Sequence, residues 1–288
     1  MRGVEMAGGD KIEILLDGLT FPEAPRWRDG KLWFSDFYTH RVLRLGLDGK
    51  AETIAEVQQR PSGLGWMPDG TLLVVSMLDR RVLKLEGGTL RLFADLSGLA
   101  TGPCNDMVVD RKGRAYVGNF GFDRHGGEPE RLTCIARIDP DGRATRAADD
   151  LFFPNGTVVT ADGKRLVVGE TLAKRLTAFD IGADGALSNR RLFAQLENCY
   201  PDGICLDAEG AIWVADARGN RALRVLDGGR IERIISTGEQ GCYACMLGGD
   251  DRRTLFLCTS SGSGPAMAKK RDGRIEFIRV DVAGAGLP

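Results

Sequence analysis

The feature that most constrains the fold of this chain is a unit that recurs six times along it, with a period of about 40–50 residues. Each unit offers a short strand, a turn, an apolar strand, a polar turn and then one or two amphipathic strands. The units begin at Phe21, Arg60, Gly102, Phe153, Tyr200 and Cys242. Repeats of this length with four strands each are typical of propeller blades. We therefore predict an all-β chain folded as a six-bladed β-propeller with four-stranded blades.

The turns and the two ends of the repeat support this architecture. Asp-Gly pairs such as Asp69-Gly70 and Asp162-Gly163 separate the apolar runs, and glycine adopts the left-handed conformations of tight hairpins without strain. The sixth unit ends after its third strand, whereas residues 11–18 form a spare strand before the first unit. Pairing the two would close the ring and cover both sheet edges. We expect one domain over residues 1–288, closed by the N-terminal strand.

Composition and charge limit the kinds of partner and the cellular compartment that we expect for this chain. Lys and Arg number 39 and Asp and Glu number 40, which gives no basic surface for nucleic acid. No apolar run approaches the roughly 20 residues of a membrane helix. Glu5 and Asp10 lie where a secretory peptide needs its apolar core, and the odd count of 7 cysteines argues against a disulfide framework. We expect a cytoplasmic protein without nucleic-acid or membrane partners, monomeric or weakly homo-oligomeric, with reduced thiols in its core.

The six units differ at a point that should face the central channel, early in the first strand. The residue pairs there are Pro22-Glu23, Pro61-Ser62, Cys104-Asn105, Pro154-Asn155, Pro201-Asp202 and Tyr243-Ala244. Two acids in one small cavity would raise each other's pKa, and a divalent cation would remove that conflict. Because all the donors are oxygens, they suit a hard ion such as Ca²⁺, Mg²⁺ or Mn²⁺. Zn²⁺ would have no nitrogen or sulfur ligand there.

Turn formation is the alternative explanation for these side chains. Asn155-Gly156 and Asp202-Gly203 are ordinary turn pairs, although turns explain less well why Glu23, Asn105, Asn155 and Asp202 coincide at one position. A second polar set follows the second strands, and we interpret it as structural because repeated positions usually serve the repeat. It comprises Asp36, Asn119, Glu170 and Asp216, with Met77 and Thr259 at the matching places.

Histidine is too scarce for two common kinds of site. Only His40 and His125 are present, so a three-histidine zinc site is impossible. A Ser-His-Asp triad would have to use one of these two side chains. Neither of these sites is therefore favoured over the oxygen cluster.

Several segments, taken together and in order, resemble the SMP-30/gluconolactonase/luciferin-regenerating enzyme (LRE) family. They are GLTFPEAPRW, CNDMVVDRKGRAYVGNF, FPNGTVVTADGKRLVVGET, YPDGICLDAEGAIWVAD and GGDDRRTLFLCTS, and the resemblance runs from about Phe21 to Val280. It implies a six-bladed propeller that binds one divalent metal. By matching motif it makes Glu23, Asn155 and Asp202 metal ligands and places Asn105 beside the metal, as a fourth ligand or a substrate contact.

One position departs from the family pattern. Sugar-lactone members often have an arginine two residues before the equivalent of Asn105, and Pro103 stands there in this chain. Proline offers neither charge nor donor, so we expect a substrate less polar than an aldonolactone. Met77, Phe120 and Phe122 are candidates to line the pocket. The insertion at residues 119–131, which contains Arg124, matches no family motif and is a candidate determinant of specificity.

The resemblance implies a metal-dependent hydrolase that opens a lactone or a similar cyclic or aryl ester with metal-activated water, and it favours Ca²⁺. We hypothesise that Asp202 acts as general base and that Asn105 stabilises the oxyanion. Two alternatives stay open: a phosphotriesterase acting on organophosphates at the same site, and a calcium-binding propeller without catalysis.

Overall fold

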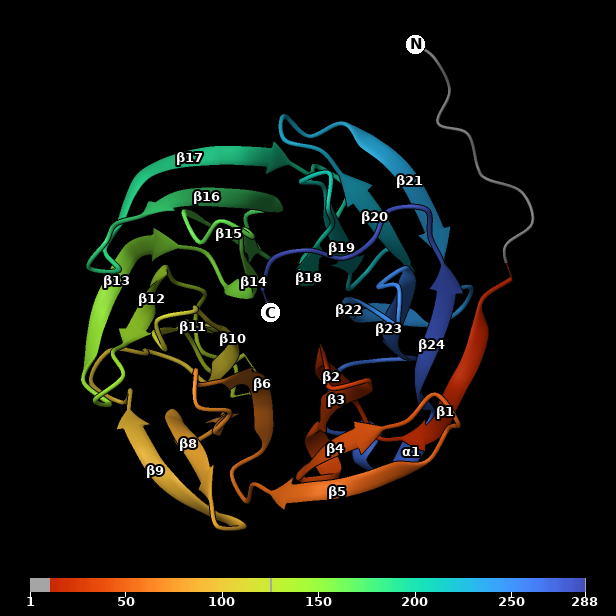
Figure 1. The fold of residues 1–288 in the computed structure, drawn as a ribbon, viewed down its shortest axis with the longest axis horizontal. Coiled ribbons are helices and arrows are strands. Elements are labelled where there is room, and N and C mark those ends of the chain that lie inside the picture. The colour runs from red at the N-terminus through yellow and green to blue at the C-terminus, as the bar shows by residue number, and fades with distance from the viewer. Residues whose placement is uncertain (1–10, 125, 288) are drawn as a thin grey trace.

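Six four-stranded antiparallel sheets surround a central axis in the computed structural model, which describes residues 11–124 and 126–287 (Figure 1). The chain runs outward through each blade, so the first strand of each unit lies next to the axis. The predicted all-β, six-bladed propeller with four-stranded blades is confirmed.

The strands follow the predicted repeat in five consecutive sheets. Blades one to three contain β2 (Pro22–Arg28), β3 (Lys31–Asp36), β4 (Arg41–Leu45) and β5 (Ala51–Glu56); β6 (Pro61–Trp66), β7 (Leu72–Ser76), β8 (Arg81–Glu86) and β9 (Thr89–Asp95); and β10 (Cys104–Val109), β11 (Ala115–Asn119), β12 (Thr133–Ile138) and β13 (Ala144–Leu151). Blades four and five contain β14 (Pro154–Val159), β15 (Arg165–Glu170), β16 (Arg175–Ile181) and β17 (Leu187–Gln195); and β18 (Pro201–Leu206), β19 (Ile212–Asp216), β20 (Arg221–Val225) and β21 (Ile231–Ser236).

The sixth blade combines both ends of the repeat, as the sequence predicts. Its order is β1-β24-β23-β22, and β1 pairs antiparallel with β24. The bounds are β1 (Glu13–Leu19), β22 (Gly241–Gly248), β23 (Thr254–Ser260) and β24 (Gly273–Arg279). The described helices are the short η1 (Phe37–Thr39) and α1 (Met267–Lys270). Neither is long or apolar enough to cross a bilayer.

Burial explains why the strands differ in composition along each blade. The inner strands β10, β14 and β18 are buried at every residue and are mostly apolar or small beyond their first polar positions, whereas the outer strand β21 has one buried residue among partly buried and exposed ones. The apolar clusters lie between neighbouring sheets. All seven cysteines are buried, and burial raises the pKa of the Cys258 thiol well above its usual value.

The second set of polar residues has the predicted structural role. Asp36 accepts hydrogen bonds from the backbone N–H groups of Thr20 and Phe21, at 3.0 and 2.8 Å. Glu170 and Asp216 likewise accept backbone hydrogen bonds at the entry to their own blades. All three carboxylates are fully buried. In these three blades they join the start of the blade to the end of its second strand.

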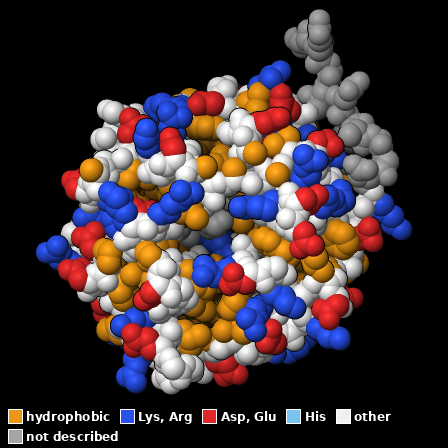
Figure 2. Space-filling view, viewed as in Figure 1, with side chains coloured by type: hydrophobic (Ala, Val, Ile, Leu, Met, Phe, Trp, Pro, Cys, Tyr) orange, Lys and Arg blue, Asp and Glu red, His pale blue; other side chains and the backbone are white. Residues whose placement is uncertain are grey.

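The C-terminal segment covers one end of the central channel. Ala285 N donates to Leu206 O and Leu287 N to Val159 O, each at 2.9 Å. Leu206 and Val159 are the last residues of β18 and β14, so the opposite end of the channel lies at the beginnings of these strands. The segment ends at the centre of the view in Figure 1. On this face, Figure 2 shows charges of both signs interspersed around a central hollow.

Candidate functional site

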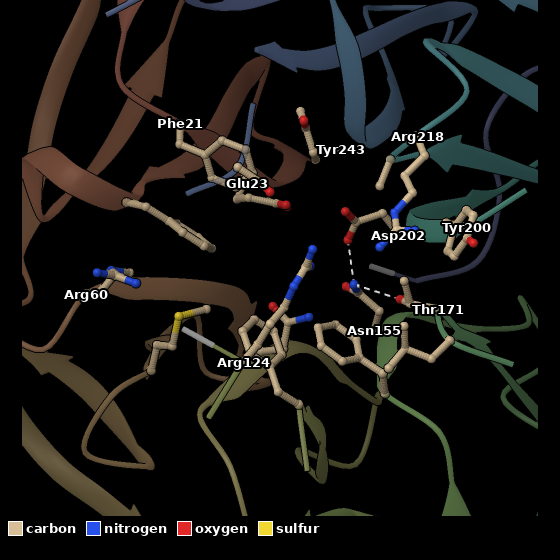
Figure 3. A pocket seen from close by; sticks show the side chains of 18 of the residues that line it. Phe21, Glu23, Arg60, Arg124, Asn155, Thr171, Tyr200, Asp202, Arg218 and Tyr243 are labelled. Atoms are coloured by element: carbon tan, nitrogen blue, oxygen red, sulfur yellow. Dashed lines mark hydrogen bonds between the residues drawn. The ribbon is translucent and has the colours of Figure 1, made fainter. Parts of the chain in front are cut away.

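The structure brings the four predicted site residues together at one cavity, at the end of the channel opposite the C-terminal segment. Glu23, Asn105, Asn155 and Asp202 are each the second residue of an inner strand, in β2, β10, β14 and β18. All four line a cavity of about 100 Å³, and three of them are labelled in Figure 3. Asn105, Asn155 and Asp202 are buried, and Glu23 is half-buried.

A backbone irregularity in each inner strand aims these side chains at the axis. Strand register shifts directly after Glu23 in β2, and between residues 104 and 107, 154 and 157, and 201 and 204 in the other three strands. Such a bulge rotates the local backbone and redirects a side chain out of the regular alternation. The polar groups therefore point into the channel instead of between sheets.

Glycines let these bulged strands approach one another. A Cβ on Gly156 would lie 2.5 Å from Asp202 O and Ile204 N, and one on Gly203 would lie 2.5 Å from the Ala244 Cβ. Both glycines lie inside strands, where only a residue without a side chain fits between two backbones. The alternative that Asn155-Gly156 and Asp202-Gly203 serve as turn pairs is therefore excluded.

Hydrogen bonds fix the orientation of the two carboxamides. Asn155 Nδ2 donates to Asp202 Oδ1 at 2.5 Å and to Thr171 Oγ1 at 3.2 Å (Figure 3). Its amide oxygen is left for the cavity. Ser62 Oγ donates to Asn105 Oδ1 at 3.3 Å, so the amide nitrogen of Asn105 remains as a donor. The two amides thus offer opposite chemistry, one an acceptor and the other a donor.

The electrostatics of the cavity disfavour two bare carboxylates. Burial, reinforced by the charge of Asp202, raises the pKa of Glu23 well above its usual value. Burial raises the pKa of Asp202 to about 8, against the opposing effect of the Asn155 hydrogen bond. A divalent cation would stabilise both charged forms and offset the repulsion.

The donor set fits a hard divalent cation. Two carboxylates and the Asn155 amide oxygen face one small cavity, and oxygen ligands are those that Ca²⁺ and Mg²⁺ take. Within the described part of the chain, no three or more His, Cys, Asp or Glu side chains form a potential metal cluster. The amides are therefore essential to any site here, which favours ions that accept neutral oxygen donors.

A buried ion pair behind the cavity was not predicted from the sequence. Arg26 Nη2 and Asp106 Oδ1 lie 2.5 Å apart, and both side chains are buried. Arg26 also donates to Leu64 O at 3.0 Å and Met107 O at 2.7 Å. It thereby ties the inner strands of three blades together next to Asn105. The one available signal was a charged residue in each of two predicted inner strands.

The rest of the lining mixes aromatic and basic side chains. Met77 and Phe120 line the cavity as expected. Phe122 does not: it is buried and packs edge-on against Phe153, with ring centroids 6.2 Å apart. Tyr243, from the channel-facing pair of the sixth unit, also lines it, whereas Arg60, Tyr200 and Arg218 were not predicted there.

Arg124 reaches the cavity from the insertion in the third blade. Its side chain points toward the space between Glu23 and Asp202 in Figure 3, and its charge lowers the pKa of Asp202. His125, in the same loop, lies outside the described residues. The absence of an arginine at position 103 therefore does not leave the cavity without guanidinium groups, and the reason for expecting a substrate of low polarity is wrong.

Known proteins with similar sequences point to one family. The sequence model of a family described as SMP-30/Gluconolactonase/LRE-like region matches residues 21–261. The chain is 28% identical over 278 residues to the pentonolactonase XacC of Haloferax volcanii, covering 92% of each. It is 28% identical over 279 residues to the 6-deoxy-6-sulfogluconolactonase of Pseudomonas putida, covering 92% of this chain and 93% of that protein.

Solved structures agree with these sequence matches. A gluconolactonase from Xanthomonas campestris is 25% identical, with a TM-score of 0.76 over 95% of this chain and 91% of that one. A luciferin-regenerating enzyme is 19% identical, with a TM-score of 0.83 over 96% and 98% of the two chains, and shows the same fold.

Proposed function

Because the chain belongs to the SMP-30/gluconolactonase/LRE-like family, we propose that it is a hydrolase that opens a lactone or a similar small ester in the cavity described above. The observation that carries the proposal is the convergence of two carboxylates and two carboxamides, from equivalent positions in four blades, on one cavity. The lactonase names of relatives that match over nine-tenths of both chains support the substrate class.

We further propose that the site holds one divalent cation, with Ca²⁺ favoured and Zn²⁺, Mg²⁺ and Mn²⁺ as competitors. Glu23, Asn155 and Asp202 would hold it through oxygen atoms, with Asn105 beside it. When bound, such an ion polarises an ester carbonyl and lowers the pKa of a water molecule.

The side chains divide the remaining work. Asp202, held by the Asn155 amide, accepts a proton from the water that attacks the carbonyl carbon. Asn105, whose oxygen is engaged by Ser62, donates from its amide nitrogen to the developing oxyanion. The ring C–O bond then breaks, the ring oxygen takes the proton from Asp202, and a hydroxy acid leaves.

A substrate panel tests the reaction class. The purified protein is stripped with a chelator and assayed on lactones, aryl esters and phosphotriesters, with each of the four cations added back singly. We expect lactone turnover that depends on added metal. Turnover of phosphotriesters alone would replace lactone hydrolysis with the phosphotriesterase alternative. Metal binding without any turnover would identify a non-catalytic propeller.

A further inference from the structure

Three arginines surround the opening of the cavity, each from a different blade. Arg60 precedes β6, Arg124 lies in the loop between β11 and β12, and Arg218 lies in the turn after β19. Arg60 is half-buried and the other two are exposed, whereas the proposed catalytic side chains, Asn105 and Asp202, are buried. The arginines therefore form a rim between the reacting groups and solvent.

Two of these guanidinium groups have aromatic neighbours, but none has an ion-pair or hydrogen-bond partner among the described residues. Within residues 11–124 and 126–287, none of the three forms an ion pair or donates a side-chain hydrogen bond, and the Nε of Arg60 is buried without a partner. Neighbouring arginines behave differently, since Arg221 pairs with Asp216 at 2.9 Å. An unpartnered buried donor is costly, so a rim of this kind points to a ligand that completes it.

Aromatic stacking holds two of the arginines in place. The guanidinium of Arg60 lies 4.7 Å from the ring centroid of Tyr38, and that of Arg218 lies 4.2 Å from the centroid of Tyr200. Stacking uses the flat face of the guanidinium and leaves its edge N–H groups free. Those edges offer the planar fork that binds carboxylate, sulfonate or phosphate oxygens.

Arg60 and Arg124 share a second feature that Arg218 lacks. Both also line a neighbouring groove of about 460 Å³, which meets the central cavity at Met77 and Phe120. A substrate whose ester lies over Asp202 would extend its other end into this groove. The junction between the two spaces is therefore flanked by two guanidinium groups.

The acids of the groove are already engaged. Glu128 pairs with Arg131 at 2.9 Å and also accepts the backbone N–H of Asp123. Asp123 accepts the backbone N–H of Gly126 at 2.8 Å. The remaining arginine of the groove, Arg80, donates to Ala100 O at 3.2 Å. These contacts leave Arg60 and Arg124 as the groups available to a ligand.

We propose that the substrate carries an anionic group, a carboxylate, sulfonate or phosphate, on the arm that extends from its ester into the groove, where Arg60 and Arg124 bind it. This inference rests on the proposed function. The cation proposed for the base of the cavity would neutralise Glu23 and Asp202, so that no carboxylate there would offset the charge of the rim arginines. The aromatic lining lowers the local dielectric and strengthens the attraction for an anion.

A matched pair of lactones tests the proposal. Glucono-1,4-lactone and glucaro-1,4-lactone share one ring and differ only in a CH₂OH or a carboxylate at carbon 6. We expect kcat/KM to be about 10-fold or more higher for the carboxylate, the scale of a charge-assisted contact. The advantage should shrink in about 1 M salt because exposed charges are screened. Equal or lower kcat/KM for the charged lactone would overturn the proposal.

Variants locate the contact. Arg60→Gln should lower the charged-to-uncharged ratio of kcat/KM by about 10-fold, mainly through KM, and Arg60→Lys should restore part of it. Arg218→Gln, on the same rim but away from the groove, should change the ratio by only about 2-fold. Arg111→Gln, in the exposed turn that follows β10, should leave kcat/KM unchanged for both lactones. An equal fall for both lactones in Arg60→Gln would show a structural role and refute the assignment.

Binding of the open-chain acids separates this inference from the proposed reaction. Calorimetry should show glucarate binding more tightly than gluconate, with the difference lost in Arg60→Gln. If no lactone is hydrolysed but this difference is seen, the reaction is wrong and the anion site stands. If lactones are hydrolysed and glucarate shows no advantage, the reaction stands and the anion site is wrong. The 6-phosphate and 6-sulfonate analogues of gluconolactone then rank the three anions.

Discussion

Asp202 has two proposed tasks in the cavity, holding a cation and moving a proton, and a passive cation site needs only the first. The Asn155 amide holds one of its oxygens, while burial raises its pKa to about 8. Without a cation Asp202 is therefore mostly protonated at neutral pH, whereas a bound cation would stabilise its charged form, which is the form that accepts a proton. The two tasks can be separated by a substitution that preserves shape.

Asp202→Asn retains an oxygen ligand but removes the charge and the basicity. We expect metal to bind more weakly, while kcat at saturating metal falls by about 100-fold or more, the scale of losing a general base. Steady-state kinetics at several metal concentrations measure both effects. Asp250→Asn, the same change at an exposed turn, serves as control. Full kcat at saturating metal would show that Asp202 is not the base.

We expect Glu23→Gln and Asn155→Ala each to weaken metal binding, as measured by calorimetry. The fold should persist, because main-chain pairs hold β2 and β14 in their sheets. Circular dichroism checks the fold in parallel. Wild-type protein that binds no cation, even at millimolar Ca²⁺ or Zn²⁺, would rule out the proposed metal site.

The raised carboxyl pKa values predict an unusual pH dependence in chelated protein. Asp202 titrates at about 8 in the fold, Glu23 well above its usual value, and both near 4 when unfolded. Between these values the folded state binds more protons, so its stability falls as pH rises from about 5 to about 8. We expect Tm to fall over this range, with a smaller slope in Asp202→Asn. Identical slopes in both proteins would contradict this origin.

At the scale of elements, the inner strands determine where the site forms. Each strand with a site residue carries its register shift at that residue. In β14 and β18 the glycine that follows the site residue also lies against the next blade. Regular strands packed around an axis would send alternate side chains into the layers between sheets. Bulge and glycine together therefore determine both the direction of the side chain and the width of the channel.

Gly156→Ala tests that coupling. Its Cβ would meet Asp202 O at 2.5 Å and would push β14 away from β18. We expect a loss of about 1–3 kcal/mol in unfolding free energy, together with weaker metal binding. Chemical denaturation and calorimetry report the two effects. In Gly98→Ala, where a Cβ would meet no atom within 4 Å, the unfolding free energy and the metal affinity should both stay unchanged. Unaltered metal binding in Gly156→Ala would show that strand spacing does not position Asp202.

At the scale of the whole molecule, the ring is closed by strands from opposite ends of the chain. β1 covers the edge of β24, and Leu19 is buried in the apolar cluster shared by the first, fifth and sixth blades. β1 thereby takes the outer position that the fourth strand holds in the other five blades, and it ties the start of the chain to blade six. Glu23 lies just after this junction, so the geometry of the site depends on it.

Leu19→Asp should therefore destabilise the entire ring. The change removes an apolar side chain and buries an unpaired charge, at a cost of about 3 kcal/mol or more. Ile14→Asp lies on the same strand but at a side chain that is 51% exposed, and should cost less than about 1 kcal/mol. Thermal melts and urea unfolding measure the stability of the two variants. Equal stability of the two variants would mean that β1 does not close the ring in solution.

The blade architecture and its closure could be predicted from the amino-acid sequence alone. Strand alternation and turn glycines are local signals, and six repeats of the same signal leave one way to bury all the sheets. The same alignment identified Glu23, Asn105, Asn155 and Asp202, because equivalent positions in a ring must converge on its axis. It left a turn as the alternative for the Asn-Gly and Asp-Gly pairs at two of them, since close approach of two backbones has no local signature.

The surroundings of those four residues could not be predicted in this way, because they depend on how the loops fold over the ring. Arg60, Arg124 and Arg218 lie in connections outside the repeated strands, and their reach into the cavity depends on how each loop folds across the opening. Phe122 turned inward against Phe153 for the same reason. Loop side chains are placed by contacts with distant blades, so their positions appear only once the ring has formed.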